Sequence, residues 1–287
     1  MLIIFVDYRR RKQAIIILIL LVILGLIGTG VYFKWFYQKP TCFDTKQNQN
    51  ETGIDCGGPC IPCERLTIKD PEIEWVKFLE LQDKVYDLAV KIDNPNPNFG
   101  LEKFKYTFEI YDETGALIKE QAGASFILPA EKKYLIEGNV AVGKKIGKVE
   151  LNLEKSSKDV WKKLKKDFES PDIYIHSKQF QYLENQVSSA RASGIIKNNS
   201  GFDFETISVA VVLFNEDKEI VGVNKTEVKT VLAGEERYFS VLWFAPFKAA
   251  VKSAEMQAET NLFLDENFMR RYGAEPEKFQ EYPGTTK

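Results

Sequence analysis

Residues 13–33 (QAIIILILLVILGLIGTGVYF) form an apolar stretch without a charged side chain. A helix needs about 20 apolar residues to cross the hydrocarbon core of a bilayer, where it satisfies its own backbone hydrogen bonds. The stretch is longer than the roughly 7–15 apolar residues of a cleaved signal peptide, and no A-x-A-like cleavage site follows it. We therefore expect an uncleaved transmembrane helix over residues 13–33, preceded by a short basic segment over residues 1–12.

The charges on either side of this stretch predict its orientation. Four basic residues precede it directly: Arg9, Arg10, Arg11 and Lys12. Two others, Lys34 and Lys39, follow it. Because basic residues are retained on the cytoplasmic side, the N-terminus is expected in the cytoplasm and residues 34–287 outside. The chain is thus expected to be anchored in the lipid bilayer through residues 13–33.

The cysteines form one cluster beyond the apolar stretch: Cys42, Cys56, Cys60 and Cys63. Clustered cysteines in an oxidising compartment pair as disulfides, and the three possible pairings remain open. A four-cysteine zinc site is an alternative. The C-x3-C-x2-C spacing also resembles the radical-SAM cluster motif, but that family uses a large α/β barrel in a reducing compartment. We expect two disulfides of unknown pairing.

The same segment is rich in side-chain oxygens, carried by Asp44, Asn48, Asn50, Glu51 and Asp55. Calcium prefers carboxylate and amide oxygens, so these residues are candidate calcium ligands. Their spacing is not that of an EF-hand loop, and the alternative is a polar loop of turn-forming residues. No other cofactor is expected.

The pattern C-x-D-x3-N-x2-E-x3-D-C-G-G-x-C-x2-C over residues 42–63 resembles a short cysteine module of predicted bacterial surface proteins. The resemblance implies a secreted context and no defined activity. So short a segment cannot bury a core, so cross-links or an ion must order it. We expect a cysteine-rich module over residues 41–65.

Beyond residue 66, apolar and polar residues alternate with the period of two that is typical of half-buried strands. Strands are predicted in the first half over residues 73–81, 106–111, 116–128, 134–142 and 148–153. They are predicted in the second half over residues 172–183, 190–198, 206–215, 219–232, 236–244 and 252–259.

The two halves can be aligned with each other. Asn94 and Asn198 are 104 residues apart, and so are Leu128 and Leu232. A shared offset of this size indicates a duplicated domain, and about 100 residues with about seven strands are typical of a β-sandwich. We predict a mainly β fold with two tandem sandwiches, over residues 66–155 and 171–264.

Residues 156–170 are predicted to form a short linker helix between the sandwiches. Val160, Leu164 and Phe168 share one helical face, Ser157 is a candidate cap and Pro171 a stop. The lysines of this segment form a solvated face or, alternatively, contact anionic lipid. Residues 265–287 are expected to be a tail that begins with an apolar helical turn and is disordered from about residue 274.

The segment FEIYD (Phe108–Asp112) resembles the F-x-L-Y-D signature of FxLYD-type domains, with Ile110 in place of Leu. The turns LPAE (128–131) and LAGE (232–235) resemble a later turn of the same family. The resemblance implies immunoglobulin-like sandwiches on the outer surface of prokaryotic cells and no catalytic residue. Independently of this resemblance, the alternation predicts that Phe108 and Ile110 belong to the core. Asp112 and Gly115 are predicted to shape a hairpin.

Catalysis is not expected. The chain has one histidine, His176, within a predicted strand, and lacks the H-E-x-x-H, G-x-x-x-x-G-K-[ST] and G-x-G-x-x-G motifs. A net charge of −2 with scattered lysines argues against nucleic acid as a partner. The sequence predicts a membrane-anchored, extracytoplasmic, non-catalytic interaction or spacer protein that binds an unidentified protein or envelope polymer. The alternatives are a structural subunit of a membrane complex, or a metal-binding sensor or enzyme that uses the cysteine module.

Overall fold

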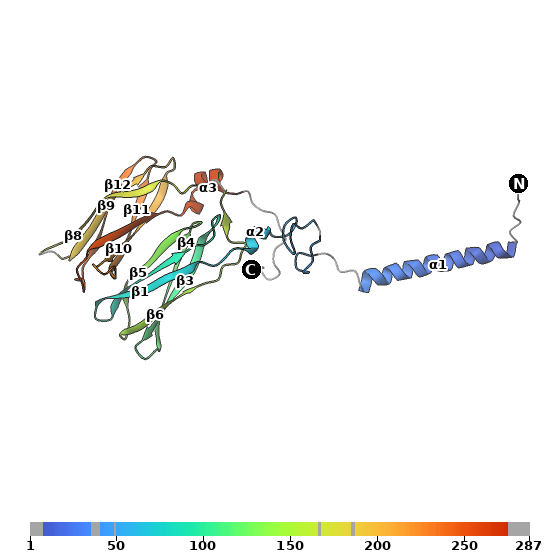
Figure 1. The fold of residues 1–287 in the computed structure, drawn as a ribbon, viewed down its shortest axis with the longest axis horizontal. Helices are drawn as coiled ribbons and strands as arrows, with labels where there is room; N and C mark the ends of the chain where they lie inside the picture. The colour runs from blue at the N-terminus through green and yellow to red at the C-terminus, as the bar shows by residue number, and fades with distance from the viewer. Residues whose placement is uncertain (1–7, 36–40, 49, 166–167, 185–186, 275–287) are drawn as a thin grey trace. The chain divides into compact units, whose positions relative to one another are not determined.

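The computed structural model describes residues 8–35, 41–48, 50–165, 168–184 and 187–274 (Figure 1). Tertiary contacts divide the chain into two units, residues 1–63 with 278–287 and residues 64–277. Among the described residues, the first unit contains the apolar helix and the cysteine-rich segment, and the second contains all of the strands. Each unit is described by itself below.

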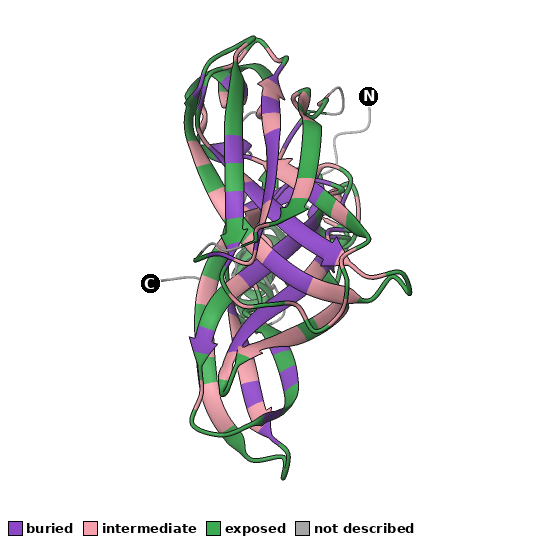
Figure 2. Cartoon of the chain, turned by 90° about the vertical axis from the view of Figure 1, so that its left-hand side faces the viewer, coloured by how far each residue is buried: buried purple, intermediate pink, exposed green. Residues whose placement is uncertain are grey.

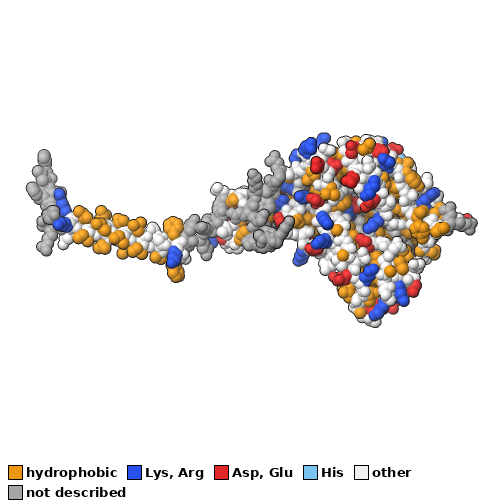
Figure 3. Space-filling view, turned by 180° about the vertical axis from the view of Figure 1, so that it is seen from behind, with side chains coloured by type: hydrophobic (Ala, Val, Ile, Leu, Met, Phe, Trp, Pro, Cys, Tyr) orange, Lys and Arg blue, Asp and Glu red, His pale blue; other side chains and the backbone are white. Residues whose placement is uncertain are grey.

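Helix α1 (Tyr8–Trp35) of the first unit has 28 residues, which correspond to a length of about 42 Å at 1.5 Å per residue. This length exceeds the roughly 30 Å of a hydrocarbon core. No side chain of its apolar window, Arg10–Trp35, is buried in the protein, and its surface is almost continuously apolar (Figure 3). The helix is therefore compatible with a membrane segment, and it extends the predicted range of residues 13–33 at both ends.

Four antiparallel sheets form the second unit (Figure 1). The sheets of the first half have the orders β1-β2-β5 and β4-β3-β6, from β1 (Glu72–Gln82), β2 (Val85–Asp93), β3 (Phe99–Asp112), β4 (Leu117–Ile127), β5 (Lys132–Ala141) and β6 (Ile146–Leu153). Those of the second half have the orders β8-β9-β12 and β11-β10-β13, from β8 (Ile173–Tyr182), β9 (Ala190–Asn198), β10 (Phe204–Phe214), β11 (Ile220–Val231), β12 (Glu236–Trp243) and β13 (Ser253–Glu259).

The two halves have the same topology. Strands β1 to β6 correspond in order to β8 to β13, and each half pairs its first, second and fifth strands in one sheet and its third, fourth and sixth in the other. The predicted mainly β fold with two sandwiches and one N-terminal helix is confirmed. Among the six sandwich strands of the first half, the prediction lacks β2, which lies at the centre of its sheet.

Each sandwich has a core of inward-facing residues at alternate strand positions, visible as banded strands in Figure 2. Phe108 and Ile110 of β3 are fully buried in the first core, and Val209 and Val211 of β10 are fully buried in the second. The core position predicted for Phe108 and Ile110 is confirmed. Burial of each such side chain stabilises the fold by about 1.5–3 kcal/mol.

A buried asparagine closes the same turn in both halves. Asn94 donates its amide to the carbonyl of Leu128 at 2.7 Å, and Asn198 donates to the carbonyl of Leu232 at 3.0 Å. Neither asparagine has any solvent exposure. The residue pairs that share the 104-residue offset therefore form equivalent hydrogen bonds in three dimensions.

The turns LPAE and LAGE are also equivalent in detail. The side chain of Glu131 accepts from the N–H of Leu128 at 2.7 Å, and that of Glu235 accepts from the N–H of Leu232 at 2.8 Å. The carbonyl of Glu131 accepts from the N–H of Asn94 at 2.9 Å, and the second copy repeats this contact at 3.0 Å. These bonds satisfy buried backbone groups at the end of each sandwich.

The two sandwiches pack through one sheet each. The outer face of β1-β2-β5 contributes Ala89, Tyr134 and Ile136, and the outer face of β11-β10-β13 contributes Ala210, Val212 and Val223. All six side chains are at most 6% exposed. Strands β2 and β10 are thus apolar on both faces, because one face lines a sandwich core and the other lines the interface.

A buried ion pair lies in the same interface. Lys133 Nζ of β5 lies 2.7 Å from Glu259 Oε1 of β13, and the lysine side chain is only 1% exposed. The same ammonium group lies 3.4 Å from the ring centroid of Phe126, within the range of a cation–π interaction. The two halves are therefore joined by both apolar and ionic contacts.

The faces equivalent to this interface on the opposite sides of the pair carry polar residues. Ala89 and Ile136 are cross-strand neighbours in the interface, and the equivalent neighbours in the second half are Ser193 and Ser240. In the first half, Glu109 occupies the position of the interface residue Val212. Three interface positions thus carry a polar residue in the other half, whereas Tyr134 is repeated as Tyr238.

The predicted linker helix over residues 156–170 is wrong for the described residues 156–165. This segment is extended and contains β7 (Lys162–Lys163), which pairs with β3. Trp161 enters the first core and Leu164 the second, whereas Val160 is 46% exposed. Because Trp161 and Leu164 enter different cores, an extended chain accommodates them better than one apolar helical face.

The lysines predicted on a solvated face of that helix instead contact the protein. Lys158 Nζ donates to the carbonyl of Leu66 at 2.6 Å, and Lys163 pairs with Glu64 at the end of α2 (Cys63–Leu66). Arg65 of α2 donates to the carbonyl of Trp161 at 3.1 Å. These contacts join the extended segment to residues 64–66.

The C-terminal part of the second unit contains η1 (Leu262–Leu264) and α3 (Glu266–Tyr272). The expected apolar helical turn is thus present. Asp265 caps α3 by accepting from the N–H of Phe268, whose side chain is fully buried in the second core. The predicted disorder from about residue 274 falls on residues 275–287, which lie outside the described residues.

Candidate functional site

The cysteine-rich segment of the first unit contains two crossed disulfides. Cys42 pairs with Cys60 and Cys56 pairs with Cys63, so no cysteine remains free. The predicted disulfides are present, and the pairing is the one in which the first cysteine bonds the third. With every thiol consumed, the four-cysteine zinc site and the iron–sulfur alternative lose their ligands.

Carboxylates of the same segment bind backbone amides. Asp55 Oδ1 accepts from the N–H groups of Asp44 and Thr45 at 3.0 and 3.1 Å. Asp44 accepts from the N–H of Lys46 and from the side-chain amide of Asn48, and the Asn48 bond lowers the pKa of Asp44. These bonds give the loop a fixed path without an apolar core.

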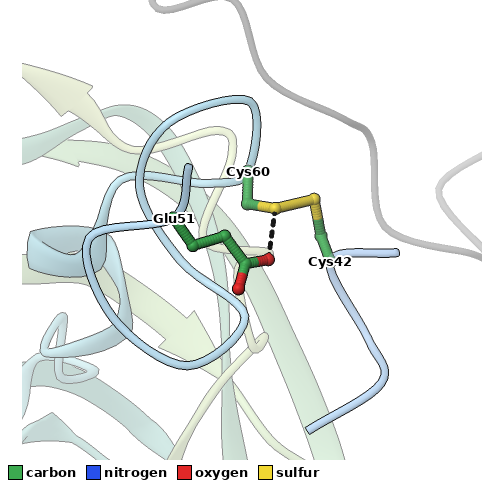
Figure 4. Close-up of side chains that lie close together, drawn as sticks. All are labelled: Cys42, Glu51 and Cys60. Atoms are coloured by element: carbon green, nitrogen blue, oxygen red, sulfur yellow. Dashed lines mark hydrogen bonds between the residues drawn. A yellow bond between two sulfur atoms is a disulfide. The ribbon is translucent and has the colours of Figure 1, made fainter. Parts of the chain in front are cut away.

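Glu51 contacts the first disulfide (Figure 4). Its Oε1 lies 2.9 Å from Cys60 Sγ, and its Oε2 accepts from the N–H of Asn48 at 3.1 Å. A disulfide sulfur carries no proton, so the first contact is a direct approach of a carboxylate oxygen to sulfur. Glu51, Cys42 and Cys60 lie within metal-binding distance of one another, but sulfurs already bonded to each other are poor ligands.

The candidate calcium ligands do not converge in this structure. The carboxylates of Asp44, Glu51 and Asp55 do not form a group within 4.8 Å of one another. Asn48 Oδ1 is one buried oxygen without a hydrogen bond, whereas calcium takes six to eight oxygens. Asn50 has a φ of 66° and serves a turn. The residues present do not fit a calcium cage.

Two glycines of the D-C-G-G pattern are required by the backbone. Gly57 and Gly58 have φ angles of 78° and 61°, a region that favours glycine. A Cβ atom at Gly58 would lie 2.5 Å from the carbonyl oxygen of Asn50. The residues of the cysteine module are thus explained by the folding of the loop itself.

We expect the crossed pairing to be visible in the alkylation of the full chain. Without reduction, the wild-type protein takes no label. The C42S/C60S variant, which removes one whole bond, also takes none, whereas C60S/C63S leaves Cys42 and Cys56 without partners and takes two labels. Intact mass before and after reduction measures this, and the reverse labelling pattern would contradict the pairing. Closure of the longer loop stabilises the module by about 3 kcal/mol.

The remaining residues considered for a site have structural surroundings. His176 lies on β8, 3.0 Å from Ser177 Oγ through Nδ1 and 3.7 Å from Glu236 through Nε2. Asp112 accepts from the N–H groups of Thr114 and Ala116 in the β3–β4 hairpin, as predicted for a turn residue. A hydrogen bond from the side chain of Lys144 lowers the pKa of Asp112.

A cavity of about 640 Å³ lies between the two sandwiches of the second unit. Its first-half wall comes from residues 81, 82, 85, 87 and 136–139, and its second-half wall comes from residues 223–225 and 242–246. We call this cavity the intersandwich cleft. Its size falls within the range of about 300–1,000 Å³ that is usual for small-molecule sites.

A buried carboxylate lines the intersandwich cleft. Asp87 of β2 is 5% exposed and accepts from the N–H of Asn139 at 3.0 Å. The pairing of β2 with β5 slips here, because Gly138 and Asn139 together lie opposite Asp87 as a β-bulge. Asn139 has a φ of 56°, which is uncommon for a residue with a side chain. Strain and bulges of this kind cluster at functional sites.

Burial raises the pKa of Asp87 to about 6, against the lowering effect of the hydrogen bond from Asn139. The other carboxylate of the cleft, Glu137, accepts from the hydroxyl of Tyr106 at 2.7 Å and lies 3.7 Å from Lys225 Nζ. Burial, followed by the bond to Glu137, raises the pKa of Tyr106. Among the described residues, the cleft therefore has one carboxylate, Glu137, beside a lysine and one, Asp87, without an ion pair.

The stability of the fold is expected to depend on pH through Asp87. The folded pKa of about 6 lies above the ordinary value of 3.8, so the folded state binds this proton more tightly than the unfolded state. The destabilisation therefore develops as pH rises from about 4 to 6 and then stays constant. We expect D87N to raise the free energy of unfolding by about 1–3 kcal/mol at pH 7.5 and to change it little at pH 4.

This expectation is measured by urea unfolding of the full chain in detergent. The exposed hairpin residue Asp217 supplies the matched control, because D217N makes the same chemical change outside the cleft. If D87N changed the free energy of unfolding equally at both pH values, ionisation of Asp87 would not destabilise the folded state.

Asp87 was missed in the sequence because β2 was missed. In β2, Asp87 and Lys91 break the apolar run, so the segment lacks a simple alternating pattern. The 104-residue offset does align Asp87 with Arg191 of a predicted strand. This alignment predicts a strand at β2. It also shows that the two halves carry opposite charges at this position.

Comparisons with known proteins do not identify a family for this chain. No family model matches, and no curated protein matches. Among solved structures, the chain is similar to Bacteroides uniformis beta-glucuronidase 2 covalently bound to cyclophellitol-6-carboxylate aziridine, at 15% identity and a TM-score of 0.20. The similarity covers 58% of this chain and 22% of that one, and a TM-score this low supports no argument about activity.

Proposed function

We propose that this chain is a membrane-anchored, extracytoplasmic and non-catalytic interaction or spacer protein. The observation that carries the proposal is the order of its parts: an exposed apolar helix of 28 residues, a module with two disulfides, and a pair of packed sandwiches. Such a chain presents folded domains at a distance from the lipid surface. The resemblance to FxLYD-type surface domains supports the same reading.

Two observations support the orientation. The basic residues Arg10, Arg11 and Lys12 lie in the first turns of α1, the end retained in the cytoplasm. The disulfides lie beyond the other end of α1 and require an oxidising compartment. The charge rule and the redox rule therefore both support an extracytoplasmic position for residues 41–287.

The sandwiches offer surface for a protein or envelope partner. On the outer face of β8-β9-β12, Tyr174 is 46% exposed, Tyr238 is 61% exposed and Leu242 is 38% exposed. Tyrosine is enriched at protein interfaces because it combines apolar area with a hydroxyl group. The visible surface in Figure 3 otherwise mixes both signs of charge, which does not favour nucleic acid.

Tags at the two ends of the full chain test this proposal. In spheroplasts, added protease is expected to remove the C-terminal tag and spare the N-terminal one, and the protein is expected to resist extraction at high pH. Changing residues 9–12 to glutamine should invert part of the population, whereas the control K34Q/K39Q should not. A protected C-terminal tag contradicts the orientation, and extraction at high pH contradicts the anchor. A membrane partner that co-purifies stoichiometrically would instead favour a structural subunit of a complex.

A further inference from the structure

The first sandwich departs from the second at one place in the β2–β5 pair. In the second half, Arg191 of β9 and Leu242 of β12 pair one to one without a register shift. At the equivalent place in the first half, Asp87 faces the bulge formed by Gly138 and Asn139. The second half therefore shows that a sheet of this topology forms without the bulge.

The bulge positions a charge that the protein does not neutralise. Asp87 has the N–H of Asn139 as its hydrogen-bond donor, and among the described residues it has no ion pair. Buried carboxylates are usually paired with a cation. With a pKa near 6, Asp87 is nevertheless ionised at neutral pH. A buried and unpaired carboxylate in the wall of a cavity indicates a cation that comes from a ligand.

The other charged groups of the intersandwich cleft do not supply this cation. Lys225, from β11, lies 3.7 Å from Glu137 of β5, so these two side chains offset each other. The wall from the end of β1, Leu81 and Gln82, has no ionisable group, and neither does the wall from residues 242–246. The cleft therefore has a net negative charge at Asp87 when that residue is ionised.

The walls favour an organic cation over a metal ion. They include the apolar residues Leu81, Val85 and Phe244, and Phe244 is 66% exposed. A hard metal ion needs about six oxygen ligands, whereas aromatic faces attract organic cations.

From the bulge, the unpaired carboxylate and the apolar walls, we infer that the intersandwich cleft binds a small organic cation. Its ammonium or guanidinium group pairs with Asp87, and its apolar body lies against Phe244. The inference concerns the second unit alone and does not depend on the orientation of the chain in a membrane.

The test uses the full chain in lipid nanodiscs and three probes of one shape: 2-phenylethylamine, 2-phenylethanol and 3-phenylpropanoate. Affinities are measured by saturation-transfer NMR at pH 7.5 and pH 5. We expect the wild-type protein to bind the amine at least tenfold more tightly than the alcohol or the carboxylate. The D87N variant is expected to lose at least tenfold in affinity for the amine and to keep its affinity for the alcohol.

Binding of the amine is expected to weaken from pH 7.5 to pH 5 in the wild type, because Asp87 becomes protonated, and to be independent of pH in D87N. The D217N control should match the wild type and corrects for partition of the probe into lipid. Absence of amine binding, equal affinity for amine and alcohol, or retained amine binding in D87N overturns the inference. Urea unfolding of D87N shows that the variant is folded, so a loss of binding is not a loss of structure.

Discussion

Replacing Asn94 or Asn198 with alanine is expected to destabilise the paired sandwiches by about 4 kcal/mol in each case. Both side chains are fully buried. Asn94 donates to the carbonyls of Phe99 and Leu128 at 2.8 and 2.7 Å, and its oxygen accepts from the N–H of Asn96 at 3.1 Å. Alanine removes these bonds, and each buried group that loses its partner costs about 1–3 kcal/mol. The carbonyls of Leu128 and Leu232 still accept from the N–H groups of Glu131 and Glu235 at 3.4 and 3.0 Å.

The same reasoning applies to the second copy. Asn198 donates to the carbonyls of Phe202 and Leu232 at 2.7 and 3.0 Å, and its oxygen accepts from the N–H of Ser200 at 3.1 Å. The two substitutions are therefore expected to have similar effects although the residues are 104 positions apart. A similar loss of unfolding free energy at both sites is expected because the two halves share the same topology.

Urea unfolding of the full chain in detergent, followed by tryptophan fluorescence, measures these effects. Trp161 reports on the first core and Trp243 on the second. The control is N152A, because Asn152 is exposed on β6 and its loss should cost less than about 0.5 kcal/mol. If N94A or N198A is no more destabilising than N152A, these asparagines do not hold the turns.

The second large effect is expected at the ion pair between Lys133 and Glu259. The E259Q variant leaves the Lys133 ammonium group buried and unpaired and should destabilise the protein by about 3–5 kcal/mol. The K133M variant leaves Glu259 without its cation and should cost a similar amount. The K133M/E259Q double variant removes both charges and is expected to lose less stability than either single variant.

Nearby Glu131 should make the effect of E259Q depend on pH. Burial raises the pKa of Glu131 to about 7, and the charge of Glu259 contributes to the rise. Without Glu259, ionised Glu131 is the remaining carboxylate near Lys133. Glu131 is protonated at low pH, so the cost of E259Q should be larger at pH 5 than at pH 8.

A double-mutant cycle by urea unfolding at both pH values measures the coupling between the two charges. The exposed pair of Lys105 and Glu154, 3.6 Å apart, is the control, and E154Q should cost less than about 1 kcal/mol. Additive effects of K133M and E259Q would contradict the coupling, since the double variant would then be the least stable of the three.

The strands could be predicted wherever one face meets solvent. In β3, Phe108 and Ile110 alternate with half-exposed residues, which gives the period of two directly. In β2, both faces are covered, because Leu88 lies in the sandwich core and Ala89 in the interface. Local alternation cannot show contact with a domain that lies about 100 residues further along the chain. Strand β10 is also covered on both faces, but its apolar run is unbroken over residues 209–214. In β2 the charged Asp87 and Lys91 interrupt the run, so β2, and Asp87 with it, was absent from the prediction.

The failure of the linker helix and the open cysteine pairing also have physical causes. A helical spacing of apolar residues assumes one buried face, whereas Trp161 and Leu164 enter two different cores. The four cysteines lie within 22 residues, so loop closure alone does not separate the three pairings. The backbone path fixed by Asp55 and Gly57 decides between them, and it depends on hydrogen bonds that a spacing pattern does not contain.

The packing between the halves joins different surfaces of two similar domains, and contacts of that kind do not close on themselves. Repeating the operation with further copies would produce an open fibre, since every added domain would again present the face that the next one needs. Ser193 and Ser240 at one end of the pair, and Glu109 at the other, reduce the apolar area available for such growth, whereas Tyr238 keeps the aromatic ring of its counterpart Tyr134. The three polar side chains therefore disfavour the addition of a further sandwich by the same contact.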